Sequence, residues 1–84
     1  MKARVFVTLK PSVFDPQGRA IVEALHSLGY ESVADVRQGK YFELDLSVPG
    51  GDAAEQLAAD VAGRVLSNPV IESFRIEIAK GPAQ

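Results

Sequence analysis

Two amphipathic helical stretches, each with marked ends, constrain the fold of this chain more than any other feature. Apolar side chains recur at helical spacing in residues 16–28 and again in residues 52–66. The end signals are Asp15-Pro16 before the first stretch, Gly29 after it, the capping-box pattern of Asp52 and Glu55, and Asn68-Pro69 after the second. We therefore expect two helices, each with an apolar face that another layer must cover.

Four segments that flank these helices are predicted to be strands, and three of them alternate between apolar and polar residues. They are residues 3–10, 33–38, 41–48 and 70–78, with a tight hairpin turn expected at Gly39-Lys40. This order predicts an α+β, ferredoxin-like β-α-β-β-α-β fold, with two helices on one face of a four-stranded antiparallel sheet. The 84 residues are expected to form a single domain, 1–84, with a frayed tail over residues 80–84.

Composition excludes several classes of function. A net charge of -2 argues against nucleic acid as a partner, because neutralising phosphates requires a basic surface. The chain has no cysteine, so it has no disulfide, thiolate metal site or cysteine nucleophile, and it fits a reducing compartment. The N-terminal segment alternates and does not resemble a signal peptide, and no stretch has the ~20 apolar residues of a membrane span. We expect a cytoplasmic protein with no membrane partner.

Candidate catalytic groups are sparse. His26 is the only histidine and is expected to point away from the apolar stripe of its helix. Glu43 and Asp45 point the same way from their strand, and paired carboxylates can bind a cation or transfer protons. The alternative is that these carboxylates pair with Arg4, Arg37 or Arg75. We expect no catalytic residue, no cofactor-binding residue and no metal ligand.

The loop over residues 9–18 is the strongest candidate for a contact surface. It carries two prolines, and it places Val13 and Phe14 where solvent is expected. Phe6, Val33 and Tyr41 are expected to lie on the open face of the sheet. A chain this short lies near the lower limit for a self-sufficient core, which favours oligomerisation or a permanent partner.

Several of these segments, in this order, closely resemble a known family. They are Leu9-Lys10-Pro11, Val13-Phe14-Asp15-Pro16-Gln17-Gly18, Ala24-Leu25, Leu28-Gly29-Tyr30, Val36-Arg37-Gln38-Gly39-Lys40 and Leu66-Ser67-Asn68-Pro69-Val70-Ile71-Glu72. The family is PurS, the small subunit of phosphoribosylformylglycinamidine synthase (FGAM synthase). The resemblance runs from about Arg4 to Ile78. One departure is Phe14, where leucine is expected.

The resemblance implies a non-catalytic subunit in purine biosynthesis. As a dimer, it would bridge a glutaminase (PurQ) and an ATP-dependent synthetase (PurL) and assist ammonia transfer. The complex would use ATP, magnesium and glutamine, none of them bound by this chain. Partner contacts are then expected at Pro11, Val13, Phe14, Gln17, Asn68 and Glu72, and self-association at the sheet. The alternative is a stand-alone domain of the same fold that senses a small molecule.

Overall fold

The computed structural model describes residues 1–79 and has an α+β fold, as predicted. The predicted tail at residues 80–84 lies outside the described residues. The elements follow in the order β1 (Lys2–Leu9), α1 (Pro16–Ser27), β2 (Gly39–Asp45), α2 (Gly51–Val61), a π-helical turn η1 (Ala62–Leu66) and β3 (Glu72–Ala79). Asp15 caps α1, Pro16 is its first residue, and Gly29 follows its end with a φ of 97°, so the bounds predicted for this helix are confirmed within one residue.

The strands form an antiparallel sheet in the order β2-β1-β3. Val5, in the central strand, lies opposite Phe42 on one side and Ile76 on the other. The alternation predicted from the sequence is confirmed along all three strands. The inner face carries Ala3, Val5, Val7, Phe42, Leu44, Phe74 and Ile76, and the open face carries Arg4, Phe6, Tyr41, Glu43, Arg75 and Glu77.

The core lies between the inner face and α2. This helix packs over β1 and β3, and Ala54, Ala58 and Ala62 are fully buried. Alanines let the helix backbone approach the valines of β1 closely, but they fill little volume. Among the described residues, Val5 and Val7 are the largest fully buried side chains, which makes a small core.

The prediction of a fourth strand is wrong for the described residues. Residues 33–38 run extended without joining the sheet, and Gly39-Lys40 begins β2 instead of forming a hairpin turn. The reason is that hydrogen-bonding groups of this segment serve the loop after β1. The backbone N–H of Gln38 donates to Asp15, and the side chain of Arg37 donates to two loop carbonyls.

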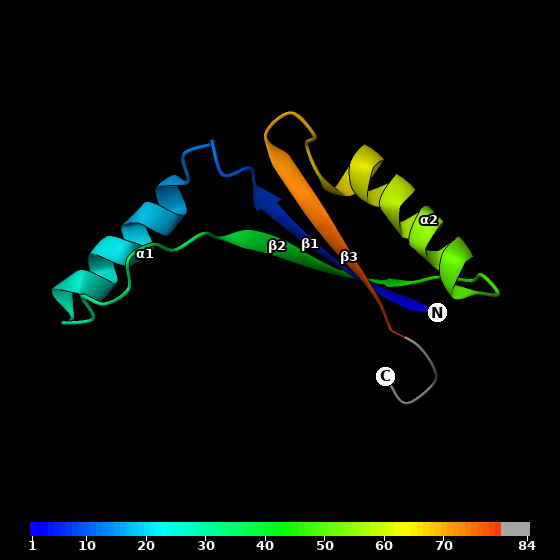
Figure 1. Cartoon of the computed structure of the whole chain (residues 1–84), viewed down its shortest axis with the longest axis horizontal. Coiled ribbons are helices and arrows are strands. Elements are labelled where there is room, and N and C mark those ends of the chain that lie inside the picture. The colour runs from blue at the N-terminus through cyan, green and yellow to red at the C-terminus, as the bar shows by residue number, and fades with distance from the viewer. Residues whose placement is uncertain (80–84) are drawn as a thin grey trace.

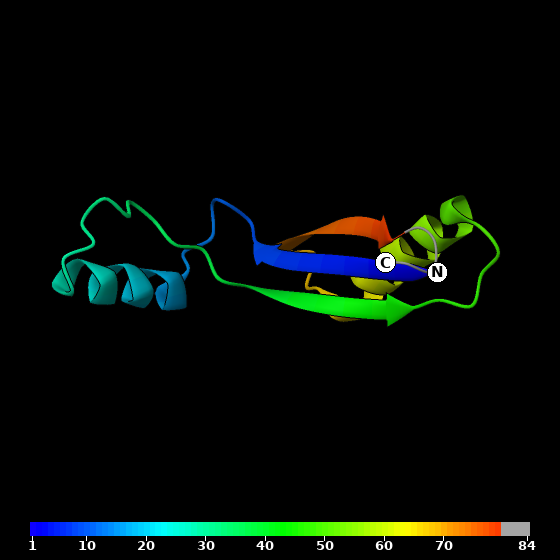
Figure 2. The same ribbon diagram turned by 90° about the horizontal axis from the view of Figure 1, so that it is seen from below.

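The expected layer of two helices on one face is also absent from the described chain. Only α2 covers the sheet, whereas α1 projects beyond its end, so that the helices lie at opposite ends of a flat molecule of 50 × 32 × 13 Å (Figures 1 and 2). The capping box at Asp52 and Glu55 is not formed either. Gly50 is the N-cap of α2 and provides no side-chain bond.

Candidate partner-binding site

The two segments expected to contact partners meet at one end of the sheet. Leu9, the last residue of β1, lies opposite Glu72, the first residue of β3. The next residue, Lys10, donates its backbone N–H to the carbonyl of Ile71 at 2.8 Å. The loop after β1 and the turn before β3 therefore form one continuous surface, at the upper edge of the sheet in Figure 1.

Asp15 holds the loop after β1 to the start of α1 and to residues 33–38. It is only 6% exposed. Its Oδ2 accepts the backbone N–H of Gln38 at 2.8 Å, and its Oδ1 accepts that of Gly18 at 2.9 Å. These two bonds, with a smaller contribution from the nearby Arg37 guanidinium, lower the pKa of Asp15 against the opposing effect of burial. Local sequence predicted the helix cap but not the bond to Gln38.

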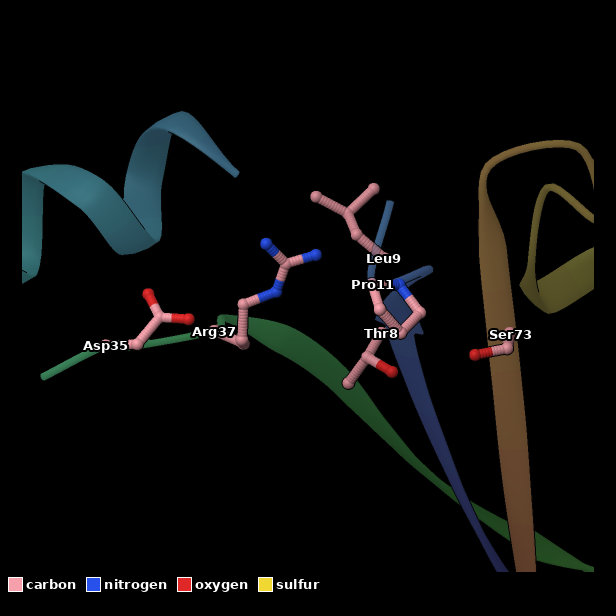
Figure 3. Close-up of a pocket in the computed structure, with 6 residues that line it drawn as sticks. All are labelled: Thr8, Leu9, Pro11, Asp35, Arg37 and Ser73. Atoms are coloured by element: carbon pink, nitrogen blue, oxygen red, sulfur yellow. The ribbon is translucent and has the colours of Figure 1, made fainter. Parts of the chain in front are cut away.

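The side chain of Arg37 also binds the loop after β1. Its Nη2 donates to the carbonyl oxygens of Lys10 at 2.9 Å and Val13 at 2.8 Å. Figure 3 shows this side chain reaching from the segment before β2 toward the loop. It borders an open depression of about 380 Å³, lined by Thr8, Leu9, Pro11, Asp35, Arg37 and Ser73. Sequence reasoning missed this role, because it placed Arg37 on the open face of the sheet.

The turn before β3 is closed by its own polar groups. Glu72 Oε1 accepts the backbone N–H of Asn68 at 2.7 Å, and Asn68 Oδ1 accepts that of Val70 at 3.1 Å. Glu72 Oε2 also lies 3.7 Å from Lys40 Nζ, which links the turn to β2. These bonds present Val70, which is 77% exposed, at the tip of the turn.

The six residues predicted to contact partners all lie at this surface, but they differ in exposure and in their neighbours. Phe14 is 70% exposed, although it is large and apolar. Gln17 and Glu72 line a shared small pocket of about 180 Å³, so α1 and the turn face each other there. Pro11 and Asn68 are exposed, whereas Val13 is half-buried and is held by Arg37.

The open face of the sheet carries a second, mixed surface. The rings of Phe6 and Tyr41 lie 5.1 Å apart, and the Arg75 guanidinium lies 4.2 Å from the centre of the Phe6 ring. Tyr41 donates its hydroxyl to Glu43 at 2.8 Å, which raises the pKa of the phenol. Val33, expected on this face, lies instead in the segment outside the sheet.

The carboxylates of the open face lie opposite basic residues in the sheet. Arg4 lies directly across from Glu43 and from Glu77, Lys2 lies across from Asp45, and Arg75 forms an ion pair with Glu77. Residues 1–79 contain no cluster of three histidine, cysteine or acidic side chains that could hold a metal ion. His26 Nε2 lies 2.8 Å from the carbonyl oxygen of Val33. In the same part of the chain, no helix is both long and apolar enough to cross a membrane.

The fold defines the class of protein: a small α+β chain whose described residues form two helices and a three-stranded antiparallel sheet. A family model described as "PurS: Phosphoribosylformylglycinamidine (FGAM) synthase" matches residues 2–80. The chain belongs to the PurS family. It is 45% identical over 83 residues to the phosphoribosylformylglycinamidine synthase subunit PurS of Bacillus subtilis, covering 99% of this chain and 98% of that subunit.

Solved structures agree with this assignment. Methanocaldococcus jannaschii PurS, described as one of the subunits of formylglycinamide ribonucleotide amidotransferase in the purine biosynthetic pathway, matches with a TM-score of 0.85 at 30% identity, covering 94% of this chain and 95% of that chain. A chain of the PurLQS structure from Thermotoga maritima matches with a TM-score of 0.83 at 25% identity, covering 90% of this chain and 93% of that chain. The ligand-sensing alternative gains no support from these matches.

Proposed function

We propose that this chain is the accessory PurS subunit of FGAM synthase, and that it bridges a PurL-type synthetase and a PurQ-type glutaminase. The observation that carries the proposal is family membership over residues 2–80, together with the likeness to a chain of a PurLQS structure. The ligation belongs to the complex, and this subunit contributes assembly and assists ammonia transfer. Its place is de novo purine biosynthesis.

The surface formed by the loop after β1 and the turn before β3 is the proposed docking site. Four hydrogen bonds restrain the loop, two accepted by Asp15 and two donated by Arg37. Phe14 is large, apolar and 70% exposed, which is the kind of side chain that becomes an anchor when a partner covers it. Pro11, Val13, Gln17, Asn68 and Glu72 complete the proposed contact set.

The cofactors belong to the complex in this proposal. ATP, magnesium and glutamine are used by the synthetase and the glutaminase, and this chain binds none of them. The whole chain, residues 1–84, acts as a single domain. The cytoplasm is the proposed location, and it is where a cysteine-free subunit of a biosynthetic ligase fits.

Reconstitution tests the function directly. The chain is mixed with purified PurL and PurQ, and FGAM formation is measured with glutamine and, separately, with ammonia as the nitrogen source. We expect the glutamine-dependent activity to require the chain. Equal activity with and without it would refute the proposal.

A matched pair of variants tests the docking site. Phe14→Asp places a negative charge at the proposed anchor. Val65→Asp introduces the same charge at a 75% exposed apolar residue on η1. We expect Phe14→Asp to raise by at least tenfold the subunit concentration needed for half-maximal activity, and Val65→Asp to leave it unchanged. Both variants should keep the wild-type melting temperature. A large drop in melting temperature for Phe14→Asp would show instead that this side chain supports the fold.

A further inference from the structure

The guanidinium of Arg37 carries a charge that no ion pair of the described chain neutralises. Three other arginines each form an ion pair with a carboxylate, whereas no ion pair within residues 1–79 includes Arg37. Its Nη2 donates to the carbonyl oxygens of Lys10 and Val13, which leaves the N–H donors of Nη1 and Nε for other acceptors. The loop after β1 therefore fixes the position of this side chain without using all of its donors.

Two hydroxyl groups lie beside Arg37 in the depression of about 380 Å³ that it borders. They belong to Thr8 and Ser73, which lie directly opposite each other in β1 and β3 and continue the rows of Phe6 and Arg75 on the open face. Both residues are exposed, and Figure 3 shows their hydroxyl groups pointing toward one another. The depression thus combines a guanidinium with two hydroxyls that can donate hydrogen bonds.

The charges around this depression favour an anionic occupant. Arg37 lies in its lining, and Lys10 lies in the chain between the lining residues Leu9 and Pro11. The acidic residue of the lining is Asp35, whose Oδ1 already accepts a backbone N–H at 2.9 Å. Because the chain as a whole has a net charge of -2, this excess of basic residues is a local feature.

A partner on the proposed docking surface would cover the depression as well. Pro11 belongs to both, and Arg37 binds the carbonyl of Val13, the residue before the proposed anchor Phe14. Such a partner removes water from the remaining donors of Arg37, which is unfavourable unless the partner supplies acceptors in its place. A carboxylate is the strongest acceptor that a protein side chain offers to a guanidinium.

We propose that this depression receives an acidic side chain, aspartate or glutamate, from a partner chain of the complex. The carboxylate accepts hydrogen bonds from Arg37 and from the hydroxyls of Thr8 and Ser73, while the methylene groups of the same side chain lie against Leu9 and Pro11. The inference rests on the proposed function, and it gives the chemistry of one contact at the proposed docking site.

The two hydroxyls can be removed without altering the bonds by which Arg37 holds the loop. The double variant Thr8→Val, Ser73→Ala keeps the shape of the site, and Ser32→Ala removes an exposed hydroxyl outside the lining. Each chain is titrated into purified PurL and PurQ, and the subunit concentration for half-maximal glutamine-dependent FGAM formation is measured. We expect this concentration to rise by about fivefold or more for the double variant and to stay unchanged for Ser32→Ala. Equal values for the double variant and the wild type would overturn the proposal.

A variant of Asp35 reports the sign of the occupant's charge, whatever the stability of the double variant. Asp35→Asn removes the negative charge of the lining and keeps the side-chain oxygen that accepts the backbone N–H. Glu31→Gln removes the same charge from an exposed residue outside the lining. We expect Asp35→Asn to lower the half-maximal subunit concentration by about threefold at low salt and by much less in about 0.5 M NaCl. A higher concentration would indicate a basic occupant, and a change equal to that of Glu31→Gln would exclude the depression from the interface, so either result would overturn the proposal.

Free anions are the other source of the same chemistry. The wild type and Thr8→Val are melted alone in about 10 mM inorganic phosphate or sodium glutamate, against sodium chloride of equal ionic strength. We expect no specific shift, because an exposed site on a single chain holds a small anion weakly. A shift that Thr8→Val abolishes would assign the depression to a free anion and overturn the proposal. Any of these failures would leave the proposed function intact, whereas FGAM formation independent of the chain would refute that function itself.

Discussion

The same substitution, glycine to alanine, is expected to have opposite effects in the two helical regions. In an exposed helix interior, alanine is preferred over glycine by about 1 kcal/mol. At Gly63, in η1, an added Cβ would meet Phe74 at 3.8 Å, an ordinary contact. At Gly18, in the first turn of α1, it would lie 2.1 Å from the carbonyl oxygen of Val36 and 3.0 Å from Asp15 Oδ2. Backbone cannot give way by that much without moving the segment before β2.

The magnitudes follow from these distances. Gly63→Ala should raise the free energy of unfolding by about 0.5–1 kcal/mol, because nothing opposes its gain in helix preference. Gly18→Ala combines that gain with overpacking of about 3 kcal/mol and with strain on the bond from Gln38 to Asp15, so we expect a net loss of about 2 kcal/mol or more. For a domain of this size, the two melting temperatures should differ by on the order of 10 °C or more.

Urea unfolding and thermal melting, both at one fixed protein concentration, measure the pair. Fixed concentration matters, because assembly stabilises the folded chain by mass action. If Gly18→Ala is as stable as the wild type, residues 33–38 do not pack on α1 as described. If Gly63→Ala loses as much stability as Gly18→Ala, the contact argument fails as a whole.

Three further predictions concern the ends of α1 and its connecting segment. Ionised Asp15 stabilises the fold above its ordinary pKa of 3.8, and this contribution is lost as the pH falls through the lowered folded-state pKa. Asp15→Asn should therefore flatten the acid limb of the unfolding free energy plotted against pH, and an unchanged limb would contradict the assignment. Gly29→Ala should cost about 1 kcal/mol in urea unfolding, because the φ of 97° strains alanine although no atom lies within 4 Å. Arg37→Gln should speed amide hydrogen exchange at Val13 by about fivefold or more, because it removes two hydrogen bonds to the loop, each worth about 1 kcal/mol. Exchange at Val13 equal to that of the wild type would show that Arg37 does not order the loop.

The features that sequence predicted correctly are those with local causes. Asp15, Pro16 and Gly29 set the bounds of α1 through bonds and dihedral angles within a few residues of each end. The alternation in β1, β2 and β3 separated the inner from the open face, because the two-residue period is a property of an extended backbone. The exposure of Phe14 was also predicted from its place in the loop after β1, whereas its contact with a partner stays a prediction.

The features that sequence missed depend on contacts between distant segments. Arg37 binds carbonyl oxygens of Lys10 and Val13, and backbone carbonyls leave no mark in the sequence that could identify them as its partners. Residues 33–38 were predicted to be a short strand, yet this segment packs on α1 at Gly18 instead of entering the sheet. The direction of α1 follows from the same contacts, so its bounds were predictable and its position was not.

The wrong strand and the misplaced helix have one physical origin. An apolar pattern states that a face must be buried, but it does not state which chain buries it. The prediction of two helices on one face assumed that a single chain of 84 residues closes its own layers. Among residues 1–79, α2 is instead the α-helix that packs over the sheet, and the fully buried side chains are no larger than valine. The bonds of Asp15 and Arg37, and the close packing of Gly18 on Val36, hold residues 33–38 against α1 and the loop after β1. The same contacts therefore keep this segment out of the sheet and place α1 beyond the end of the sheet.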